Sequence, residues 1–215
     1  MAKVKVCGIT NYVDAVNAVD LGADYLGFNF FKKSPRHIKS SKAAIIIKKL
    51  PKKVKTVGIF VNESIGKINN IVDICNIDII QLSGDENMEF ISDLKKSSNK
   101  KIIKTLRIGK KIFLEKIFSP IADYIMLDSY KKGVYGGTGT KFDWSIAKKL
   151  NKKRLFLSGG LNPVNVKQAI YEVNPYCVDV CSGVEKSYGK KDFKKMKEFI
   201  KITKKFNCKA VELFP

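Results

Sequence analysis

Short β-branched, apolar runs alternate along the chain with longer segments in which apolar residues recur every three or four positions. The spacing within the longer segments is helical, as in Ile65, Ile68, Ile71 and Val72 or in Val166, Ala169, Ile170 and Val173. The short runs predict eight β-strands, at Val4 to Cys7, Tyr25 to Phe30, Val57 to Val61, Ile79 to Leu82, Ile102 to Leu106, Tyr124 to Leu127, Leu155 to Leu157 and Val178 to Cys181. Strand and helix are therefore expected to alternate throughout.

The ends of several predicted helices carry capping residues. Ser64 is a predicted N-cap, Asn162 and Pro163 are a predicted N-cap and first helical residue, and Gly22 lies just past the first helix. The last helix is expected to bury one face, made by Phe193, Met196, Phe199 and Ile200.

The number and spacing of the strands define the expected fold class. Eight strands at a mean spacing of about 25 residues fit a closed parallel barrel better than a doubly wound sheet of five or six strands. No G-x-G-x-x-G motif follows the first strand, so the main marker of a dinucleotide fold is missing. An aspartate directly before three strands, at Asp24, Asp78 and Asp123, suggests a repeated unit. The chain is predicted to be a single-domain (β/α)8 TIM barrel over residues 1–215, with eight parallel strands.

Composition limits the class of protein and its surroundings. No apolar run approaches the ~20 residues of a membrane helix, and the N-terminus has no export signal. The five cysteines are odd in number and contain no C-x-x-C pair, so neither a disulfide framework nor a zinc site is indicated. We expect a cytoplasmic protein without a membrane partner or a metal.

The formal net charge of +21 raises the possibility of nucleic-acid binding. Only three of the 41 basic residues are arginines, namely Arg36, Arg107 and Arg154, and the lysines are scattered along every predicted helix. Because base and phosphate readers rely on arginine forks and on clusters interleaved with aromatics, solvated lysine-rich faces are favoured over nucleic-acid binding. The positive charge would still attract small anionic substrates.

In a parallel barrel the chemistry lies at the carboxyl ends of the strands. Cys7 ends the first predicted strand, the stretch from Phe30 to Arg36 follows the second, and Asp128 follows the sixth. A thiolate and a carboxylic acid at one barrel mouth can act as base and acid if their pKa values are suitably shifted. Cys7 is alternatively an inert buried residue, Asp128 a loop cap and Arg36 a surface cation. The lone His37 sits poorly for a hydrolase triad, so proton transfer without a triad is the better interpretation.

Two neighbouring loops are predicted to bind phosphate. Gly159 and Gly160 follow the seventh strand, and Ser182 and Gly183 follow the eighth. Gly159 and Gly160 alone are consistent with a tight turn, but together with Ser182 and Gly183 in the next loop they favour phosphate binding, because small loops after strands seven and eight of a barrel commonly cradle a phosphate with their backbone N–H groups. The segment from Lys131 to Lys141, which directly follows Asp128, is glycine-rich and is predicted to be a lid, through Gly136, Gly137, Thr138 and Gly139.

The motifs at the strand ends together resemble the phosphoribosylanthranilate isomerase family over almost the whole chain. These are Lys5 to Thr10, Gly22 to Phe28, Ser34 to Arg36, Val57 to Asn62, Gln81 to Glu86, Leu127 to Ser129, Gly136 to Gly139 with Phe142 to Trp144, Ser158 to Leu161 and Val178 to Glu185.

The resemblance implies an isomerisation of tryptophan biosynthesis that needs no cofactor or metal. The substrate would be N-(5-phosphoribosyl)anthranilate, a small phosphosugar, and the reaction an Amadori rearrangement to the 1-deoxyribulose 5-phosphate product. By resemblance, Asp128 is the general acid, Cys7 the general base, Arg36 holds the anthranilate carboxylate and Asp179 touches the substrate. We expect a monomer or homodimer.

Two departures and two alternatives accompany the resemblance. Ser83 stands where the family usually has histidine, so altered substrate positioning and a lower rate are expected; Cys181 replaces a residue that is more often serine. The imidazole isomerase of histidine biosynthesis performs the same chemistry, but it resembles two half-barrels with an aspartate at the end of the first strand, where this chain has Cys7. A non-catalytic basic barrel that binds polyanions is the other alternative.

Overall fold

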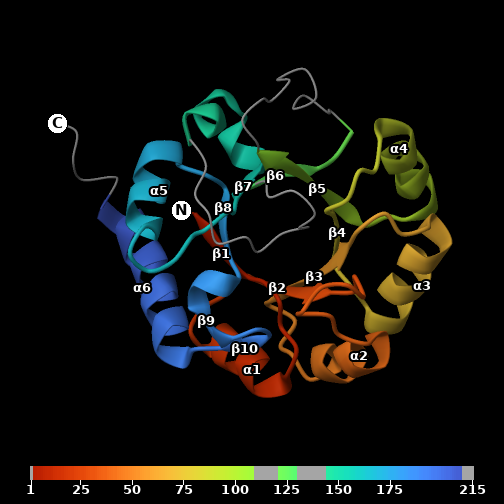
Figure 1. Cartoon of the computed structure of the whole chain (residues 1–215), viewed down its shortest axis with the longest axis horizontal. Coiled ribbons are helices and arrows are strands. Elements are labelled where there is room, and N and C mark those ends of the chain that lie inside the picture. Colours follow the sequence, from red (N-terminus) through yellow and green to blue (C-terminus); the bar gives the residue numbers. More distant parts are fainter. Residues whose placement is uncertain (1, 109–120, 130–143, 210–215) are drawn as a thin grey trace.

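Eight parallel strands close into a barrel, each pairing with the next along the chain and β8 pairing with β1 (Figure 1). The computed structural model describes residues 2–108, 121–129 and 144–209. The strands are β1 Lys3–Val6, β2 Tyr25–Asn29, β3 Lys55–Phe60, β4 Ile79–Leu82, β5 Lys101–Ile108, β6 Tyr124–Ser129, β7 Leu155–Leu157 and β8 Cys177–Val180. The predicted fold class is confirmed, and each predicted strand overlaps an observed one.

The helices lie around the outside of the barrel, as Figure 1 shows. They are α1 Tyr12–Asp20, α2 Ser40–Lys48, α3 Ile65–Cys75, α4 Met88–Ser97, α5 Val166–Val173 and α6 Phe193–Lys209. In the described residues between β6 and β7 the connection contains the 3-10 helices η2 Trp144–Lys149 and η3 Lys152–Arg154, where an α-helix was expected. A further 3-10 helix, η4 Ser182–Val184, and the hairpin of β9 Glu185–Ser187 and β10 Lys190–Lys191 separate β8 from α6.

The helical faces expected from the sequence are buried against the barrel. The four residues of α5 that the spacing predicted to face the core are buried, as are Ile68, Ile71 and Val72 of α3. On α6 the prediction holds for Met196, Phe199 and Ile200, whereas Phe193 at the first turn is 47% exposed. Among the described residues, no helix combines the length and the hydropathy needed to cross a bilayer.

Two predicted helix boundaries are confirmed and one is wrong. Ser64 is the N-cap of α3, and Gly22 follows the C-cap of α1 with φ of 99°. Helix α5 begins at Val166 rather than Pro163. The Asn162 side chain accepts hydrogen bonds from the backbone N–H groups of Val164 and Asn165 and so closes a separate turn before the helix.

The three aspartates that precede strands have one shared role. The carboxylate of Asp24 accepts a hydrogen bond from the Val4 N–H, that of Asp78 from Thr56, and that of Asp123 from Ile102, at 2.8–2.9 Å. Each aspartate stands before an even-numbered strand and binds the backbone of the strand before it. The repeat in the sequence therefore marks repeated clamps at the amino ends of the strands.

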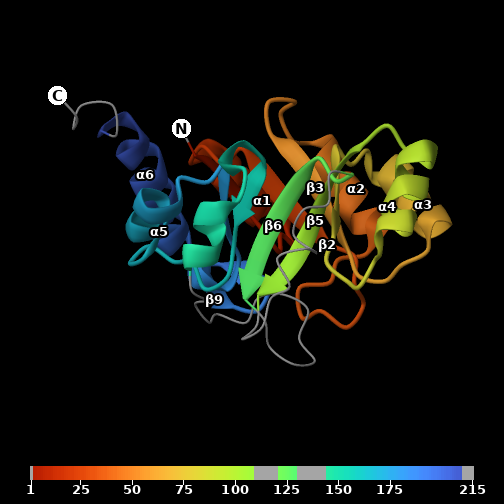
Figure 2. The same cartoon turned by 90° about the horizontal axis from the view of Figure 1, so that it is seen from above.

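The inside of the barrel changes in polarity along its axis. Near the amino ends of their strands, side chains form an apolar cluster of Tyr25, Val57, Ile79, Ile103, Met126, Phe156 and Cys177. Toward the carboxyl ends the buried side chains are polar, namely Lys5, Gln81, Thr105, Asp128, Ser158 and Asp179. Figure 2 shows β5 and β6 with their carboxyl ends on one side of the molecule, the side on which β9 also lies. The apolar cluster closes the barrel below, so the polar layer forms the floor of a site that opens at the carboxyl ends.

Candidate active site

A cavity of about 430 Å³ lies at the carboxyl ends of the strands. It is lined by seven of the predicted site residues, Cys7, Arg36, Asp128, Gly159, Gly160, Asp179 and Ser182. Gly183 lies behind this wall, against the neighbouring loop. The predicted lid residues Gly136, Gly137, Thr138 and Gly139 fall outside the described residues.

Asp128 is a buried carboxyl group near the end of β6, 7% exposed. Burial raises its pKa to about 6, and the negative charge of Asp179 acts in the same direction. One oxygen accepts a hydrogen bond from the Ser129 N–H at 2.8 Å, which opposes that rise. Asp128 is therefore a carboxyl group that can hold a proton close to neutral pH.

Cys7 directly follows β1 and is half-buried in the wall of the cavity. A hydrogen bond from the Cys181 thiol lowers the pKa of Cys7 to about 7, against the effect of burial. The ammonium groups of Lys5 and Lys191 lower it further, whereas Asp179 raises it. The pKa values of the two candidate groups are thus shifted toward each other. The thiol is easily deprotonated, and the carboxyl is easily protonated.

A buried ion pair lies at the centre of this arrangement. Lys5 Nζ is fully buried and donates to Asp179 Oδ1 at 2.7 Å, and Ser158 Oγ donates to Asp179 Oδ2 at 2.9 Å. Although burial opposes it, the Asp179 carboxylate raises the pKa of Lys5, so the lysine stays charged. The pair supplies the positive charge that favours the Cys7 thiolate and the negative charge that favours the neutral Asp128.

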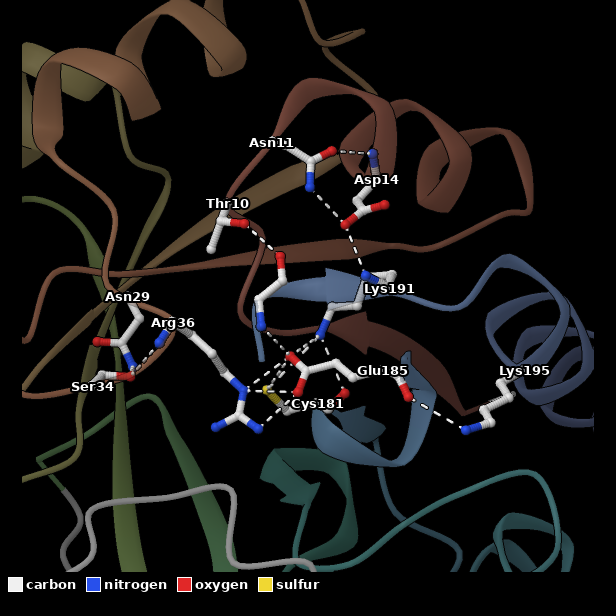
Figure 3. Close-up of polar contacts among 11 residues, drawn as sticks. Thr10, Asn11, Asp14, Asn29, Ser34, Arg36, Cys181, Glu185, Lys191 and Lys195 are labelled. Atoms are coloured by element: carbon white, nitrogen blue, oxygen red, sulfur yellow. Dashed lines mark hydrogen bonds and ion pairs between the residues drawn. The ribbon is translucent and has the colours of Figure 1, made fainter. Parts of the chain in front are cut away.

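Arg36 faces the cavity from the loop after β2 and is held from behind by the hairpin. Its Nε and Nη2 atoms donate to both carboxylate oxygens of Glu185 at 2.8–3.1 Å, as Figure 3 shows. Its guanidinium lies over the ring of Tyr188, 5.1 Å from the centroid. Lys191 Nζ contacts the same Glu185 carboxylate at 3.1 Å from the other side. Glu185 thus fixes one edge of the guanidinium and leaves the other edge for a planar anion.

The loop that carries Arg36 is shaped by short polar contacts. Asn29 accepts from the Phe31 N–H at 2.9 Å. As Figure 3 shows, Asn29 also donates to Ser34 Oγ at 3.1 Å, and Ser34 Oγ in turn accepts from the Arg36 N–H at 3.2 Å. His37 continues this loop, forms an isolated bridge with Asn29 and does not line the cavity.

The two glycine loops meet at one edge of the cavity. Gly159 and Gly160 have φ of 89° and 67°, a backbone conformation that L side chains rarely adopt. Their N–H groups donate to no acceptor within the described part of the chain. A Cβ on Gly183 would collide with the carbonyl oxygen of Leu161, so only glycine allows the two loops this contact. Small loops with unused N–H groups are suited to an oxyanion.

Ser83 lies in a buried polar cluster on the cavity floor. It is 7% exposed, accepts from Gln81 Nε2 at 3.0 Å and shares a hydrogen bond of 3.1 Å with Thr105 Oγ1. Gln81 Oε1 is buried without a hydrogen-bond partner among the described residues. Ser83 also lines the cavity, so the residue type at this position shapes part of the cavity floor.

Lys5, Glu185 and Lys191 belong to the site but were not predicted from the sequence as members of it. Lys5 alternates with Val4 and Val6, and such a lysine is normally assigned to solvent. In a barrel wrapped by helices, however, the valines face the helices and the residue between them points into the barrel. Within the described residues, no group of three or more histidine, cysteine or acidic side chains is placed to hold a metal.

The fold and the site define a class: a (β/α)8-barrel enzyme with a carboxyl group and a thiol of shifted pKa in one cavity at the carboxyl ends of its strands. A family model described as N-(5'-phosphoribosyl)anthranilate isomerase matches residues 4–202. The chain belongs to this family.

Individual proteins support the assignment. An enzyme of that name from Aquifex aeolicus is 48% identical over 211 residues, covering 95% of this chain and 99% of the relative. The crystal structure of phosphoribosyl anthranilate isomerase from Thermotoga maritima has a TM-score of 0.87 at 39% identity, covering 95% of this chain and all of that one. A further phosphoribosyl anthranilate isomerase structure, in complex with reduced 1-(o-carboxyphenylamino)-1-deoxyribulose 5-phosphate, has a TM-score of 0.84 at 38% identity, with the same coverage.

The family assignment decides between the alternatives that the sequence left open. The chain belongs to a family of phosphoribosylanthranilate isomerases. This family is different from the imidazole isomerase of histidine biosynthesis, and it is a family of enzymes, not of non-catalytic polyanion-binding barrels.

Proposed function

We propose that this protein isomerises N-(5-phosphoribosyl)anthranilate to 1-(2-carboxyphenylamino)-1-deoxyribulose 5-phosphate, with Asp128 as general acid and Cys7 as general base. The observation that carries the proposal is that these two groups line the same cavity with pKa values of about 6 and about 7. A relative of the same family is described in complex with a reduced form of that product.

The first step would be ring opening. Asp128 donates its proton to the furanose ring oxygen, the bond between that oxygen and C1′ breaks, and the anilino nitrogen forms a Schiff base with C1′. A substrate that fills the cavity displaces water from Asp128 and adds a negative phosphate nearby, and both effects favour the protonated carboxyl that this step needs.

The second step would be proton removal at C2′. The Cys7 thiolate takes the C2′ proton, the resulting enolamine tautomerises, and the ketone of the product forms. Lys5 is oriented by Asp179 and lies close enough to Cys7 to lower its pKa, so it stabilises the thiolate before the transfer. No hydride or electron leaves the substrate in either step.

The two ends of the substrate would be held by separate parts of the cavity. Arg36, fixed by Glu185, offers its free edge to the anthranilate carboxylate. Gly159, Gly160, Ser182 and Gly183 offer backbone N–H groups to the phosphate. Asp179 would contact the sugar between these anchors, because it lies beside both Cys7 and Asp128.

An assay of the purified chain tests this function. Freshly prepared phosphoribosylanthranilate should lose its fluorescence in the presence of the protein, and mass and chromatographic analysis should identify the deoxyribulose phosphate product at unchanged mass. Decay no faster than in buffer, or a product of different mass, would overturn the proposal.

A further inference from the structure

Two cysteines of the cavity directly follow neighbouring strands, Cys7 after β1 and Cys181 after β8. In the pairing of β1 with β8, Lys5 lies opposite Asp179 and Val6 opposite Val180, and the Cys7 N–H donates to the Val180 carbonyl at 2.9 Å. Cys7 and Cys181 are the next residues on the two chains. Adjacent strands lie about 4.8 Å apart, which falls within the Cα separation that a disulfide requires.

The side chains of this pair both face the cavity. Residues two apart on a strand share a face, so Cys7 and Cys181 continue the face on which Lys5 and Asp179 form their 2.7 Å ion pair. Each of the two thiols shifts the pKa of the other, and a Cβ on Gly8, the residue after Cys7, would lie 3.0 Å from Cys181 Sγ. The register of the two backbones therefore allows a bond between the two sulfur atoms.

The surroundings of the pair favour oxidation of Cys7. Both cysteines line the 430 Å³ cavity, so a small hydroperoxide can reach them, whereas Cys75 and Cys177 are buried. The thiolate is the form that attacks a peroxide, and the Lys5 ammonium stabilises it on Cys7. Lys191 Nζ lies 3.9 Å from Cys181 Sγ, and the Arg36 guanidinium lies beside the same sulfur (Figure 3).

We infer that Cys7 and Cys181 form a reversible disulfide when the protein meets a hydroperoxide, and that this bond is a modification site of the active cavity. The Cys7 thiolate attacks the peroxide, an S–O bond forms as the O–O bond breaks, and Cys7 becomes a sulfenic acid while the other peroxide oxygen leaves as alkoxide or hydroxide and takes a proton from water to become alcohol or water. Cys181 then attacks the Cys7 sulfur, the S–S bond forms, the S–O bond breaks, and the leaving oxygen takes the Cys181 proton as water. The two thiols together lose two electrons, and one peroxide gains them.

The order of these steps follows from the charges. While Cys7 is a thiolate, its hydrogen bond and negative charge raise the pKa of Cys181. Conversion of Cys7 to a neutral sulfenic acid removes that charge, and Lys191 and Arg36 then favour the Cys181 thiolate. Cys7 is therefore the residue that reacts with the peroxide, and Cys181 is the residue that then attacks the Cys7 sulfenic acid to form the disulfide. The effect on catalysis rests on the proposed function, in which Cys7 is the base.

The test is exposure of the purified protein to hydrogen peroxide, followed by alkylation, digestion with trypsin and a protease that cleaves before aspartate, and mass spectrometry. Cleavage before Asp179 separates Cys177 from Cys181. The parent and the C177S control should yield a peptide linking Cys7 to Cys181, with two thiols lost and both recovered by dithiothreitol. C181S should yield no such link, and its Cys7 should pass to sulfinic acid that dithiothreitol does not reduce.

Activity is followed in parallel as a fraction of each protein's own starting value. The parent should lose at least roughly tenfold and regain it with reductant, while C181S should lose activity without regaining it. A parent without the linked peptide, or a C181S variant that recovers as the parent does, overturns the inference. A parent that is inactive before oxidation overturns the proposed function instead, and the peptide analysis still decides the disulfide.

Discussion

At the scale of single residues, the chemistry of the cavity depends on how neighbouring groups shift the pKa values of Cys7 and Asp128. Burial and Asp179 raise the pKa of Asp128, while Cys181, Lys5 and Lys191 lower that of Cys7. Neither shift is visible in the sequence, because Asp179, Cys181 and Lys191 are distant along the chain and the burial of Lys5 beside Cys7 follows only from the fold. The positions of Cys7 and Asp128 were predictable, since both stand at strand ends, but their protonation behaviour was not.

A pH profile of kcat/KM follows from these shifts. Activity needs Cys7 without its proton, a fraction that grows up to and above pH 7, and Asp128 with its proton, a fraction that shrinks above pH 6. The product of the two fractions is a bell with its maximum between pH 6 and 7, at which no more than roughly a tenth of the free enzyme has both groups correctly protonated. Steady-state assays from pH 4.5 to 9 should show this bell, which belongs to the pair of groups. Activity that is flat up to pH 9 would be inconsistent with it.

At the scale of elements, the site depends on the contact between the loops after β7 and β8. The loop after β7 was predictable from its glycines, and the positive φ values of Gly159 and Gly160 explain why glycine is needed there. The start of α5 was predicted three residues too early. Asn162 followed by Pro163 is as typical of a helix N-cap as of the separate turn that Asn162 forms here. The connection before β7 also departs from expectation, with 3-10 helices in its described part.

Substitution of Gly183 by alanine tests the loop contact. The added Cβ would collide with the Leu161 carbonyl and push the two loops apart, so KM should rise at least roughly tenfold while kcat changes less. Gly66 in α3 is a matched control, because a Cβ there meets nothing within 4 Å. G66A should leave kinetics unchanged and stabilise the fold by up to about 1 kcal/mol. A G183A enzyme with the parent's KM would mean that the loop contact does not position the phosphate.

At the scale of the whole molecule, the barrel places an apolar cluster at its amino end and charged groups above it. The sequence predicted eight strands and their order because β-branched runs mark buried parallel strands well. It did not reveal Lys5 as an interior residue, because alternation alone does not say which face of a strand looks into a barrel. The structure resolves this, with Val4 and Val6 against the helices and Lys5 paired with Asp179.

Removal of one partner of this interior ion pair should destabilise the protein more than removal of both partners. K5M leaves the Asp179 carboxylate buried without its cation and should lower the free energy of unfolding by about 3–5 kcal/mol. The double variant K5M/D179L removes both charges and should be less destabilised than K5M alone. Urea denaturation of the parent, both single variants and the double variant gives the coupling energy. Additive losses would show that the two side chains do not stabilise each other.

The most direct test of the central claim is the kcat/KM of C7S and D128N with phosphoribosylanthranilate, measured beside the parent. Both side chains line the cavity, so we expect their replacement to leave the barrel strands intact. Each variant should retain the parent's urea midpoint and lose at least roughly a hundredfold in kcat/KM, the usual worth of a general acid or base. A folded C7S or D128N enzyme with a kcat/KM near that of the parent would contradict the roles assigned to these residues.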